Sequence, residues 1–200
     1  MKVLQINSSI QGPAGQSTIL ATQLARELGD DIVVRDLVAE PIPHLTAERF
    51  AAFLAKPAER TAAQQVVVEE SDALINELRE AEVIVLGLPM YNYGVPSQLK
   101  AWFDHVARAG VTFRYTEKGP QGLITGKKVY VISTRGGLYA GTARDSETVH
   151  VREFLALLGL TDVEFIYAEG LAMGDTVREP ALAQARERVT RIAQPIAFAA

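Results

Sequence analysis

The sequence predicts an α/β fold in which one parallel sheet is covered by helices on both faces. Short apolar runs alternate five times with longer stretches of helical periodicity along the 200 residues. This alternation is typical of parallel strands joined by right-handed crossovers. Residues 83–88 are apolar nearly throughout, as expected of a central strand buried on both sides. No repeat, low-complexity tract or linker interrupts the pattern, so we expect one domain spanning residues 1–200.

The first half of the chain carries the signals of two strands and three helices. After Ser17, the residues Leu20, Leu24 and Leu28 recur at the spacing of one helical face. Gly29 follows, where that helix is expected to end. The elements expected here are strands at residues 3–6 and 32–34 and helices at residues 17–28, 47–54 and 61–80.

The second half starts with the central strand, which Pro89 should end, and a helix for which Pro96 suits the first position. That helix carries apolar residues at i, i+3, i+4 and i+7, namely Leu99, Trp102, Phe103 and Val106. Further strands are expected at residues 129–132 and 163–167 and helices at residues 149–158 and 180–193, with glycine-containing connections at residues 110–125 and 134–148.

Charge and composition exclude several kinds of function. Twenty Lys and Arg against 24 Asp and Glu give a net charge of −4, so the chain lacks the basic excess with which nucleic-acid-binding proteins neutralise phosphates. The absence of cysteine excludes disulfides, thiolate metal sites and a cysteine nucleophile. The three histidines lack metal-ligand spacing, and no apolar stretch has the length of a membrane span. We therefore expect a cytoplasmic protein without a metal, a nucleic-acid partner or a membrane segment.

Topology predicts where a ligand binds. In an open parallel sheet, ligands lie beyond the carboxyl ends of the strands, where the strand order reverses. With the strand order 2-1-3-4-5, three loops that follow strands would share one edge of the sheet. These loops span residues 8–17, 89–95 and 134–148.

The first of these loops has features of a phosphate-binding loop. It leads from a strand into a helix N-terminus, where free N–H groups and the helix dipole favour an anion. Ser9, Ser17 and Thr18 could add hydroxyl donors. The loop has neither the Gly-Lys-Ser/Thr of a Walker loop nor the GxGxxG of a dinucleotide fold. The alternative is that Ser17 only caps the helix.

The other two loops could enclose a flat ring. Met90, Tyr91 and Tyr93 offer apolar surface beside backbone amides, which suits a planar heteroaromatic ring. The alternative for this loop is an aromatic plug over the core. Gly136 and Gly137 let the backbone of the third loop approach a ligand closely, although a plain tight turn would also explain them.

A phosphate-binding loop and two ring-binding loops together describe a mononucleotide with a large ring system, and FMN fits. FAD would need space for an adenosine half, for which the chain has no second domain. A hydrolase is disfavoured because no GxSxG elbow is present. A phosphoreceiver domain is disfavoured because Asn-Ser-Ser and Pro-Met follow the first and central strands in place of acidic residues.

Several segments resemble one known family. From residue 1 to about residue 175 the chain is similar to FMN-dependent NADH-azoreductases, a branch of the flavodoxin-like quinone reductases. The matching segments are SS at 8–9 with GQS at 15–17, PMYNY at 89–93, ARAGVTFRYTE at 107–117 with GP at 119–120 and GL at 122–123, RGG at 135–137 and AEG at 168–170. Taken together these segments are specific, although each alone is weak.

The resemblance implies a flavodoxin-like, doubly wound sheet of five strands, a homodimer, and one non-covalently bound FMN per subunit. It implies that the phosphate is held by Ser9, Gly15, Gln16 and Ser17. The isoalloxazine would be lined by two segments, Pro89, Met90, Tyr91, Asn92 and Tyr93, and Thr134, Arg135, Gly136 and Gly137. The partner subunit and the segment around Phe113 and Tyr115 would form the substrate pocket, for which Tyr139 is a further candidate.

The chain departs from the family in a few places. Many members have Phe where this chain has Tyr93, and several have His where it has Tyr139. Residues 43–62 follow no tight pattern. These departures concern the substrate range and leave the flavin site intact.

The expected reaction has two steps, in which NADH or NADPH reduces the flavin and leaves before an azo compound or quinone takes the electrons. We assign no catalytic side chain, and nothing in the sequence selects NADH over NADPH or azo compounds over quinones. The alternative function is a flavodoxin-type electron carrier serving protein partners, and a non-catalytic interaction protein is a further alternative. Basic residues near the expected site favour an anionic nicotinamide cofactor over a cationic redox partner. They are Arg108, Arg114, Lys118, Lys127, Lys128, Arg135 and Arg144.

Overall fold

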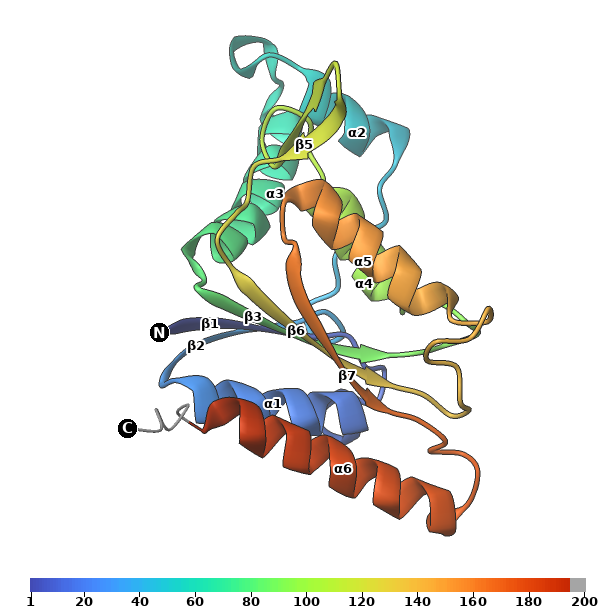
Figure 1. Ribbon diagram of the computed structural model, residues 1–200. Coiled ribbons are helices and arrows are strands. Elements are labelled where there is room, and N and C mark those ends of the chain that lie inside the picture. Colours follow the sequence, from blue (N-terminus) through green and yellow to red (C-terminus); the bar gives the residue numbers. More distant parts are fainter. Residues whose placement is uncertain (195–200) are drawn as a thin grey trace.

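The computed structural model describes residues 1–194 and contains a five-stranded parallel sheet (Figure 1). Its strands are β1 (Lys2–Asn7), β2 (Asp31–Asp36), β3 (Val83–Pro89), β6 (Lys128–Thr134) and β7 (Asp162–Ala168). They lie in the order β2-β1-β3-β6-β7. Because β4 (Phe113–Thr116) and β5 (Gly119–Gly122) form a separate hairpin, this is the expected order 2-1-3-4-5 of the parallel strands.

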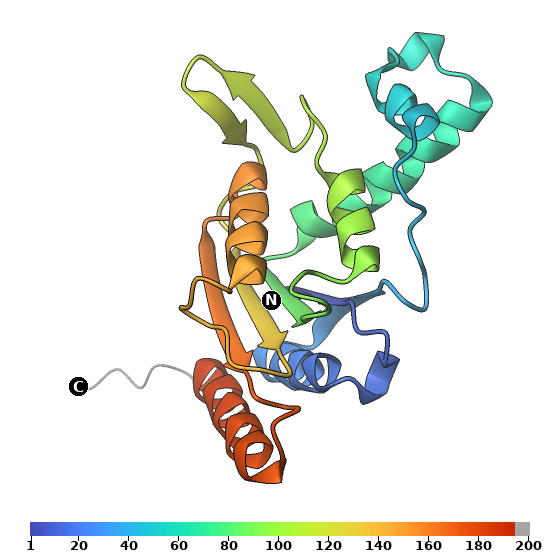
Figure 2. The same cartoon turned by 90° about the vertical axis from the view of Figure 1, so that its right-hand side faces the viewer.

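Helices cover both faces of the sheet. On one face lie α1 (Gln16–Leu28) and α6 (Asp175–Ala193), and on the other lie α3 (Ala62–Glu80), α4 (Ser97–Val106) and α5 (Ser146–Leu158) (Figure 1). The helix α2 (Ala47–Leu54) packs on α3 and itself lies away from the sheet (Figure 2). Two single-turn 3₁₀ helices, η1 (Gly12–Ala14) and η2 (Pro57–Glu59), complete the elements.

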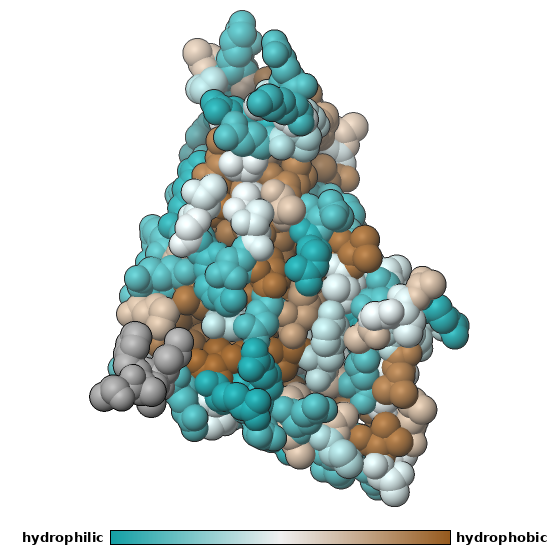
Figure 3. All heavy atoms as spheres, viewed as in Figure 1, coloured by the Kyte–Doolittle hydropathy of each residue, from teal (hydrophilic) through white to brown (hydrophobic). Residues whose placement is uncertain are grey.

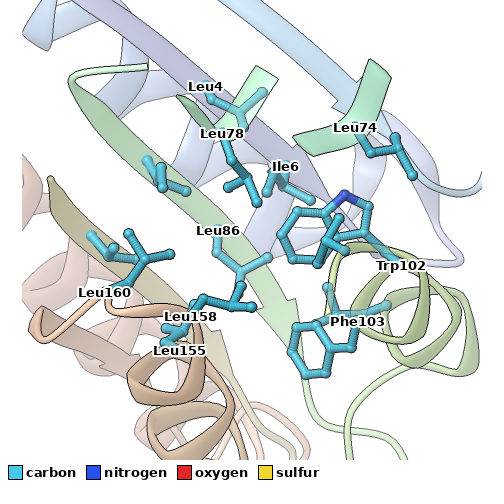
Figure 4. Packing of buried hydrophobic residues seen from close by; sticks show 14 of the residues in the cluster. Leu4, Ile6, Leu74, Leu78, Leu86, Trp102, Phe103, Leu155, Leu158 and Leu160 are labelled. Carbon is cyan, nitrogen blue, oxygen red and sulfur yellow. The ribbon is translucent and has the colours of Figure 1, made fainter. Parts of the chain in front are cut away.

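The central strand β3 supplies both cores, because successive side chains of a strand point to opposite faces. Ile84 and Leu86 belong to the larger cluster, in which Trp102 and Phe103 of α4 pack against leucines of α3 and α5 (Figure 4). Val83 and Val85 belong to the second cluster, beneath α1 and α6. Burying one such side chain stabilises the fold by about 1.5–3 kcal/mol, which explains why residues 83–88 are almost entirely apolar.

The strand register places three loops at one edge of the sheet. Asn7 pairs with Gly87 across β1 and β3, and Pro89 pairs with Thr134 across β3 and β6. The backbone N–H of Met90 donates to Thr134 O at 2.9 Å, which ties the second loop to the end of β6. The edge where these strands end faces the viewer in Figure 2. The three loops chosen from the sequence therefore do share one rim.

Two expected helix starts are wrong by three or more positions, and those expected at Ser17, Thr61 and Pro96 each differ from the structure by one residue. The Asp145 carboxylate accepts from Thr148 N at 3.2 Å, so α5 starts at Ser146 and not at residue 149. Pro96 is the N-cap residue of α4, and the helix itself starts at Ser97. The last helix begins at Asp175, five positions before the expected Pro180, which lies inside it. A proline removes one helical N–H bond, but here it does not set the helix boundary.

The connection at residues 110–125 holds the antiparallel hairpin β4–β5, for which no strand was expected. The hairpin packs on the carboxyl end of α5, and Ile124 N donates to Leu158 O at 2.9 Å. A Cβ on Gly122 would lie 2.0 Å from Gly159 N, so only glycine permits this approach. The hairpin is therefore docked against α5 by direct backbone contact.

The surface is hydrophilic over most of the side shown in Figure 3, with apolar residues also visible between α5 and α6, along the edge strand β7. Within residues 1–194, none of the helices combines the length and the apolar character that a membrane crossing needs.

Candidate functional site

A pocket of about 300 Å³ lies where β1, β3 and β6 end. All three rim loops contribute to it, and so does the segment that leads from β7 into α6. Its lining is Ser9, Gln11 and Gln16 from the first loop, Pro89, Met90 and Tyr91 from the second, Thr134, Arg135 and Gly136 from the third, and Leu171 and Arg178 beyond β7. No carboxylate lines the pocket among the described residues.

The N-terminus of α1 offers donors that the protein does not use. The first N–H groups of a helix have no intrahelical acceptor, and the first such bond here is Ile19 N to Gly15 O at 2.9 Å. The hydroxyls of Ser17 and Thr18 are buried and have no hydrogen-bond partner within residues 1–194. Buried polar groups nearly always have partners. Unused donors beside a helix N-terminus therefore indicate an anion site, and Ser17 does not act as a side-chain cap.

Gly15 and Ser9 are in close contact. A Cβ on Gly15 would lie 2.3 Å from Ser9 Oγ, a distance that no real Cβ contact tolerates. Ser9 Oγ accepts from Gln11 N at 3.2 Å and lies 3.4 Å from the Tyr91 hydroxyl. Tyr91 in turn accepts from Ile10 N at 3.2 Å. The first and second loops are thus joined at the pocket.

The second loop turns sharply through two residues in the left-handed region. Asn92 has φ 51° and Tyr93 has φ 64°, while Tyr91 and Gly94 exchange both backbone hydrogen bonds at 3.0 Å. A bulky residue at positive φ costs on the order of 1 kcal/mol or more. Such strain clusters at functional positions, and it argues against the loop being a simple plug.

The third loop is hydrogen-bonded to the end of β7 and to the turn that follows β7. Arg135 N donates to Ala168 O at 2.9 Å, and Leu171 N donates to Arg135 O at 3.0 Å. Ala172 N and Gly170 N donate to the carbonyls of Gly136 and Gly137 at 3.0 and 2.9 Å. These bonds use the carbonyls of the glycines and leave their N–H groups without an acceptor in the described part of the chain.

The side chain of Arg135 turns away from the pocket into a cluster of carboxylates. It is fully buried and lies 2.9 Å from Asp145 and 3.2 Å from both Glu147 and Glu169. Its guanidinium also stacks 5.0 Å from the centre of the Tyr167 ring. The pKa of Glu147 is raised to about 7, because loss of solvation outweighs the attraction of Arg135. Only the Arg135 backbone is therefore placed to contact a ligand.

Tyr139, a candidate for the substrate pocket, lies at the rim. Its ring meets the Tyr93 ring edge-on at 5.3 Å, and Arg144 Nη2 donates to the Tyr93 hydroxyl at 2.6 Å. The neighbouring Tyr93 hydroxyl is the main reason why the pKa of Tyr139 is raised. The structure thus groups Tyr93, Tyr139 and Arg144 beside the second and third loops.

Phe113 and Tyr115 do not join the pocket of their own chain. Phe113 is buried at the base of the hairpin, and Tyr115 is 76% exposed. The hairpin docks at the carboxyl end of α5, whereas the third loop leads into the amino end. A helix of 13 residues separates the two, about 20 Å at 1.5 Å per residue.

The basic cluster expected near the site is mostly elsewhere. Arg108 is buried and bonded to Asp72, and Lys127 and Lys128 lie at the opposite end of β6. Arg114 and Lys118 are on the hairpin, and Arg135 is held by carboxylates. Of the seven, only Arg144 reaches the rim without a carboxylate partner among the described residues, and its guanidinium donates to the Tyr93 hydroxyl. Basic charge in the sequence therefore does not by itself distinguish an enzyme from an electron carrier here.

Comparison with known proteins identifies the family. The profile of a family described as "Flavodoxin-like fold" matches residues 1–192. A Burkholderia lata protein named FMN-dependent NADH:quinone oxidoreductase 6 is 54% identical over 192 residues, which cover 94% of this chain and 97% of that protein. The chain belongs to this oxidoreductase family. An Alcanivorax borkumensis protein named FMN-dependent NADH:quinone oxidoreductase is 52% identical, over 94% of this chain and 98% of its own length.

Solved structures of azoreductases have the same fold as this chain. An azoreductase from Bacillus anthracis superposes with a TM-score of 0.87 at 25% identity, covering 96% of this chain and 98% of its own. An FMN-dependent NADH-azoreductase from the same species, solved in complex with FMN, has a TM-score of 0.81 at 24% identity over 96% and 99% of the two chains and supports the fold. The resemblance to this oxidoreductase family is therefore confirmed.

Sequence reasoning missed several residues at the site. Leu171 and Arg178 line the pocket, and the Glu169 carboxylate accepts a hydrogen bond from the backbone of the third loop at Tyr139. No local motif marks Arg178. The signal that could have found it is topological, because the helix after the last strand returns beside α1 on the same face of the sheet.

Proposed function

We propose that the protein is an FMN-dependent oxidoreductase that uses NADH or NADPH to reduce quinones and azo compounds. The observation that carries the proposal is the buried hydroxyl of Ser17 in the first turn of α1, which has no partner within residues 1–194 and lies next to two loops whose amides lack acceptors there. The names of relatives at 52–54% identity support the same activity. A location in the cytoplasm and a single domain over residues 1–200 stay predictions of the sequence.

The first loop fits the phosphate of FMN. Ser17 contributes a hydroxyl, Gln16 an amide side chain, and the start of α1 its first N–H groups. Neither the hydroxyl nor these N–H groups have an acceptor or donor partner in the part of the chain that the structure describes. Gly15 leaves the space next to Ser9 that any side chain would fill. A dianion beside these donors gains charge-assisted hydrogen bonds and the favourable end of the helix dipole.

The second and third loops suit the flavin ring. Met90 and Tyr91 offer flat apolar surface, and the backbone N–H groups of the strained turn at Asn92 and Tyr93 have no acceptor within residues 1–194. The amides of Gly136 and Gly137 are free to donate to a ring held in the pocket. Fixed donors aimed at developing negative charge stabilise it without reorganisation.

The chemistry that bound FMN supplies is the acceptance and return of a hydride equivalent. The protein's part is to hold the ring in one orientation, with one face open for nicotinamide and acceptor in turn. Donor and acceptor atoms must come within about 3–3.5 Å. No side chain is required as a general base, which is consistent with the absence of carboxylates from the described pocket lining.

A homodimer belongs to the proposal. Tyr115 is 76% exposed and stands about a helix length from the pocket of its own chain. The hairpin of a second copy would bring Tyr115 and Phe113 to the substrate side of the pocket, as the family resemblance implies. Sedimentation analysis tests this state, and Tyr115→Ala should raise KM for a quinone while leaving FMN content unchanged.

An anaerobic reduction experiment tests the function. The FMN-loaded protein is mixed with NADH and the visible flavin band is followed. Rapid bleaching that a quinone or an azo dye reverses is the expected result. Bound FMN that neither NADH nor NADPH reduces would instead favour the one-electron carrier, and a protein that retains no flavin would overturn the proposal.

A further inference from the structure

Arg178 is a cation in the pocket lining that the FMN contacts expected from the sequence do not include. It lines the pocket together with Ser9, Gln11 and Gln16, and it comes from the first turn of α6. Cations are disfavoured in the first turn of a helix, where the dipole is positive. An arginine placed there beside unused donors of α1 calls for an anion to offset it.

The start of α6 is fixed next to the third loop. Gly170 N donates to Gly137 O at 2.9 Å, and Arg178 N donates to Gly174 O at 3.0 Å. Gly170 has φ +73°, and a Cβ there would lie 2.6 Å from a Val177 methyl carbon. The turn between β7 and α6 is thus hydrogen-bonded to the third loop and closely packed on Val177, and the Arg178 backbone lies beside the pocket.

The guanidinium of Arg178 is available to a ligand. Its nearest carboxylates, Asp175 and Glu179, lie 4.0 and 3.9 Å away and are 88% and 60% exposed. Such surface pairs contribute little, and the guanidinium makes no hydrogen bond within residues 1–194. Arg135, the other arginine of the pocket lining, has its donors taken by three carboxylates.

We propose that Arg178 binds the phosphate of FMN from the α6 side and makes the site selective for FMN over riboflavin. This inference rests on the proposed function, since it assigns a residue to the same cofactor site. The guanidinium would face the phosphate across from Ser9 and the α1 amides. A planar fork of N–H donors matches phosphate oxygens better than an ammonium does.

Flavin affinity tests the proposal. Full-length wild-type protein and the variants Arg178→Gln and Arg178→Lys are loaded with FMN or with riboflavin, and dissociation constants are obtained by equilibrium dilution with flavin fluorescence. Arg178→Gln should weaken FMN binding about 10- to 100-fold, as expected for a charge-assisted bond, and leave riboflavin binding unchanged. Arg178→Lys should recover part of the loss.

A matched control comes from the same helix. Arg186 is exposed, lies two turns farther along α6 and makes no ion pair within the described residues. Arg186→Gln removes the same charge and should leave both affinities at the wild-type value. Circular dichroism checks that all variants are folded.

The outcomes separate this inference from the function itself. Equal losses of FMN and riboflavin affinity, or no loss of either, would overturn the role of Arg178 while leaving a flavoenzyme. An unchanged FMN affinity with a raised KM for NADH would assign Arg178 to the diphosphate of the nicotinamide cofactor and overturn the proposal as well. A wild-type protein that binds neither flavin would instead contradict the proposed function.

Discussion

Glu169 Oε1 accepts a hydrogen bond from Arg135 Nη1 at 3.2 Å, and the same oxygen accepts from the backbone amides of Tyr139 and Ala140 at 2.8 and 2.9 Å. One carboxylate oxygen therefore ties the start of the third loop to its middle. The loop is shaped by the protein before a ring arrives, so little conformational freedom is lost on binding.

Replacing Glu169 should loosen this loop. Glu169→Ala removes the acceptor of both amides and leaves Arg135 with one carboxylate fewer, so we expect FMN affinity to fall at least about tenfold. Glu169→Gln keeps an acceptor oxygen and should lie between this variant and wild type. Fluorescence titration measures the affinity, and the position of the bound-flavin absorption band reports whether the ring environment has changed. Glu187→Ala, at an exposed site farther along α6, is the control.

Substitution of two buried serines by alanine should have opposite effects on FMN affinity and on stability. Ser17 Oγ has no partner within residues 1–194, so Ser17→Ala should leave the flavin-free protein as stable as wild type, yet weaken FMN binding about tenfold. Ser71 Oγ donates to His105 O at 2.6 Å, far from the pocket, so Ser71→Ala should cost about 1–3 kcal/mol of stability without changing FMN affinity. Thermal unfolding and flavin titration on both variants check this. Parallel losses of affinity in the two would contradict the assignment of Ser17.

Gly15→Ala should damage the phosphate site by steric contact alone. The backbone at Gly15, φ −67° and ψ 133°, is open to alanine, but the new Cβ would meet Ser9 Oγ at 2.3 Å. We expect a loss of about 1–3 kcal/mol in stability and a larger than tenfold loss of FMN affinity. The double variant Ser9→Gly/Gly15→Ala should recover the stability but not the affinity. Wild-type binding by the single variant would show that Ser9 does not face the ligand.

Glu147 should make stability depend on pH. Its pKa is raised from 4.5 to about 7 by burial, so between these values the native protein holds a proton that the unfolded chain has released. The free energy of unfolding therefore falls as pH rises through this window, by up to about 3 kcal/mol from this group. Denaturant titrations at several pH values measure the slope.

The variant Glu147→Gln isolates this contribution. The side chain at position 147 of this variant cannot ionise. As pH rises from about 4.5 to 7, the wild type should therefore lose unfolding free energy relative to the variant. A difference that stays constant across the window would mean that Glu147 remains ionised beside Arg135.

Much of the fold could be predicted from the sequence, because several elements have strong local patterns of apolar residues. The apolar run of β3 and the single apolar face of α4 were recognisable without tertiary contacts. The hairpin β4–β5 was not, because both strands have only four residues and β5 contains two glycines and a proline. Its position also depends on the contact between Gly122 and Gly159. The early start of α6 was hidden by Pro180, which usually signals a boundary.

The site was predictable where one loop carries the chemistry and unpredictable where distant segments meet. The phosphate loop was visible because a strand, glycines and serines follow one another in the chain. The carboxylates around Arg135 come from two segments, the start of α5 and the residue after β7, and Arg178 belongs to the last helix. Their proximity follows from the sheet order and from packing, which residue spacing does not encode.

The pairing between the third loop and the turn after β7 has a consequence for solvent exchange. The amide hydrogens of Gly170, Leu171 and Ala172 are bonded to that loop, so they should be exchanged slowly although they belong to a connecting segment. Those of Gly136 and Gly137 lack acceptors among the described residues and should be exchanged quickly until a ring covers them. The third loop and the turn after β7 would thus differ in deuterium uptake although they are hydrogen-bonded to each other. The difference would disappear when FMN occupies the pocket.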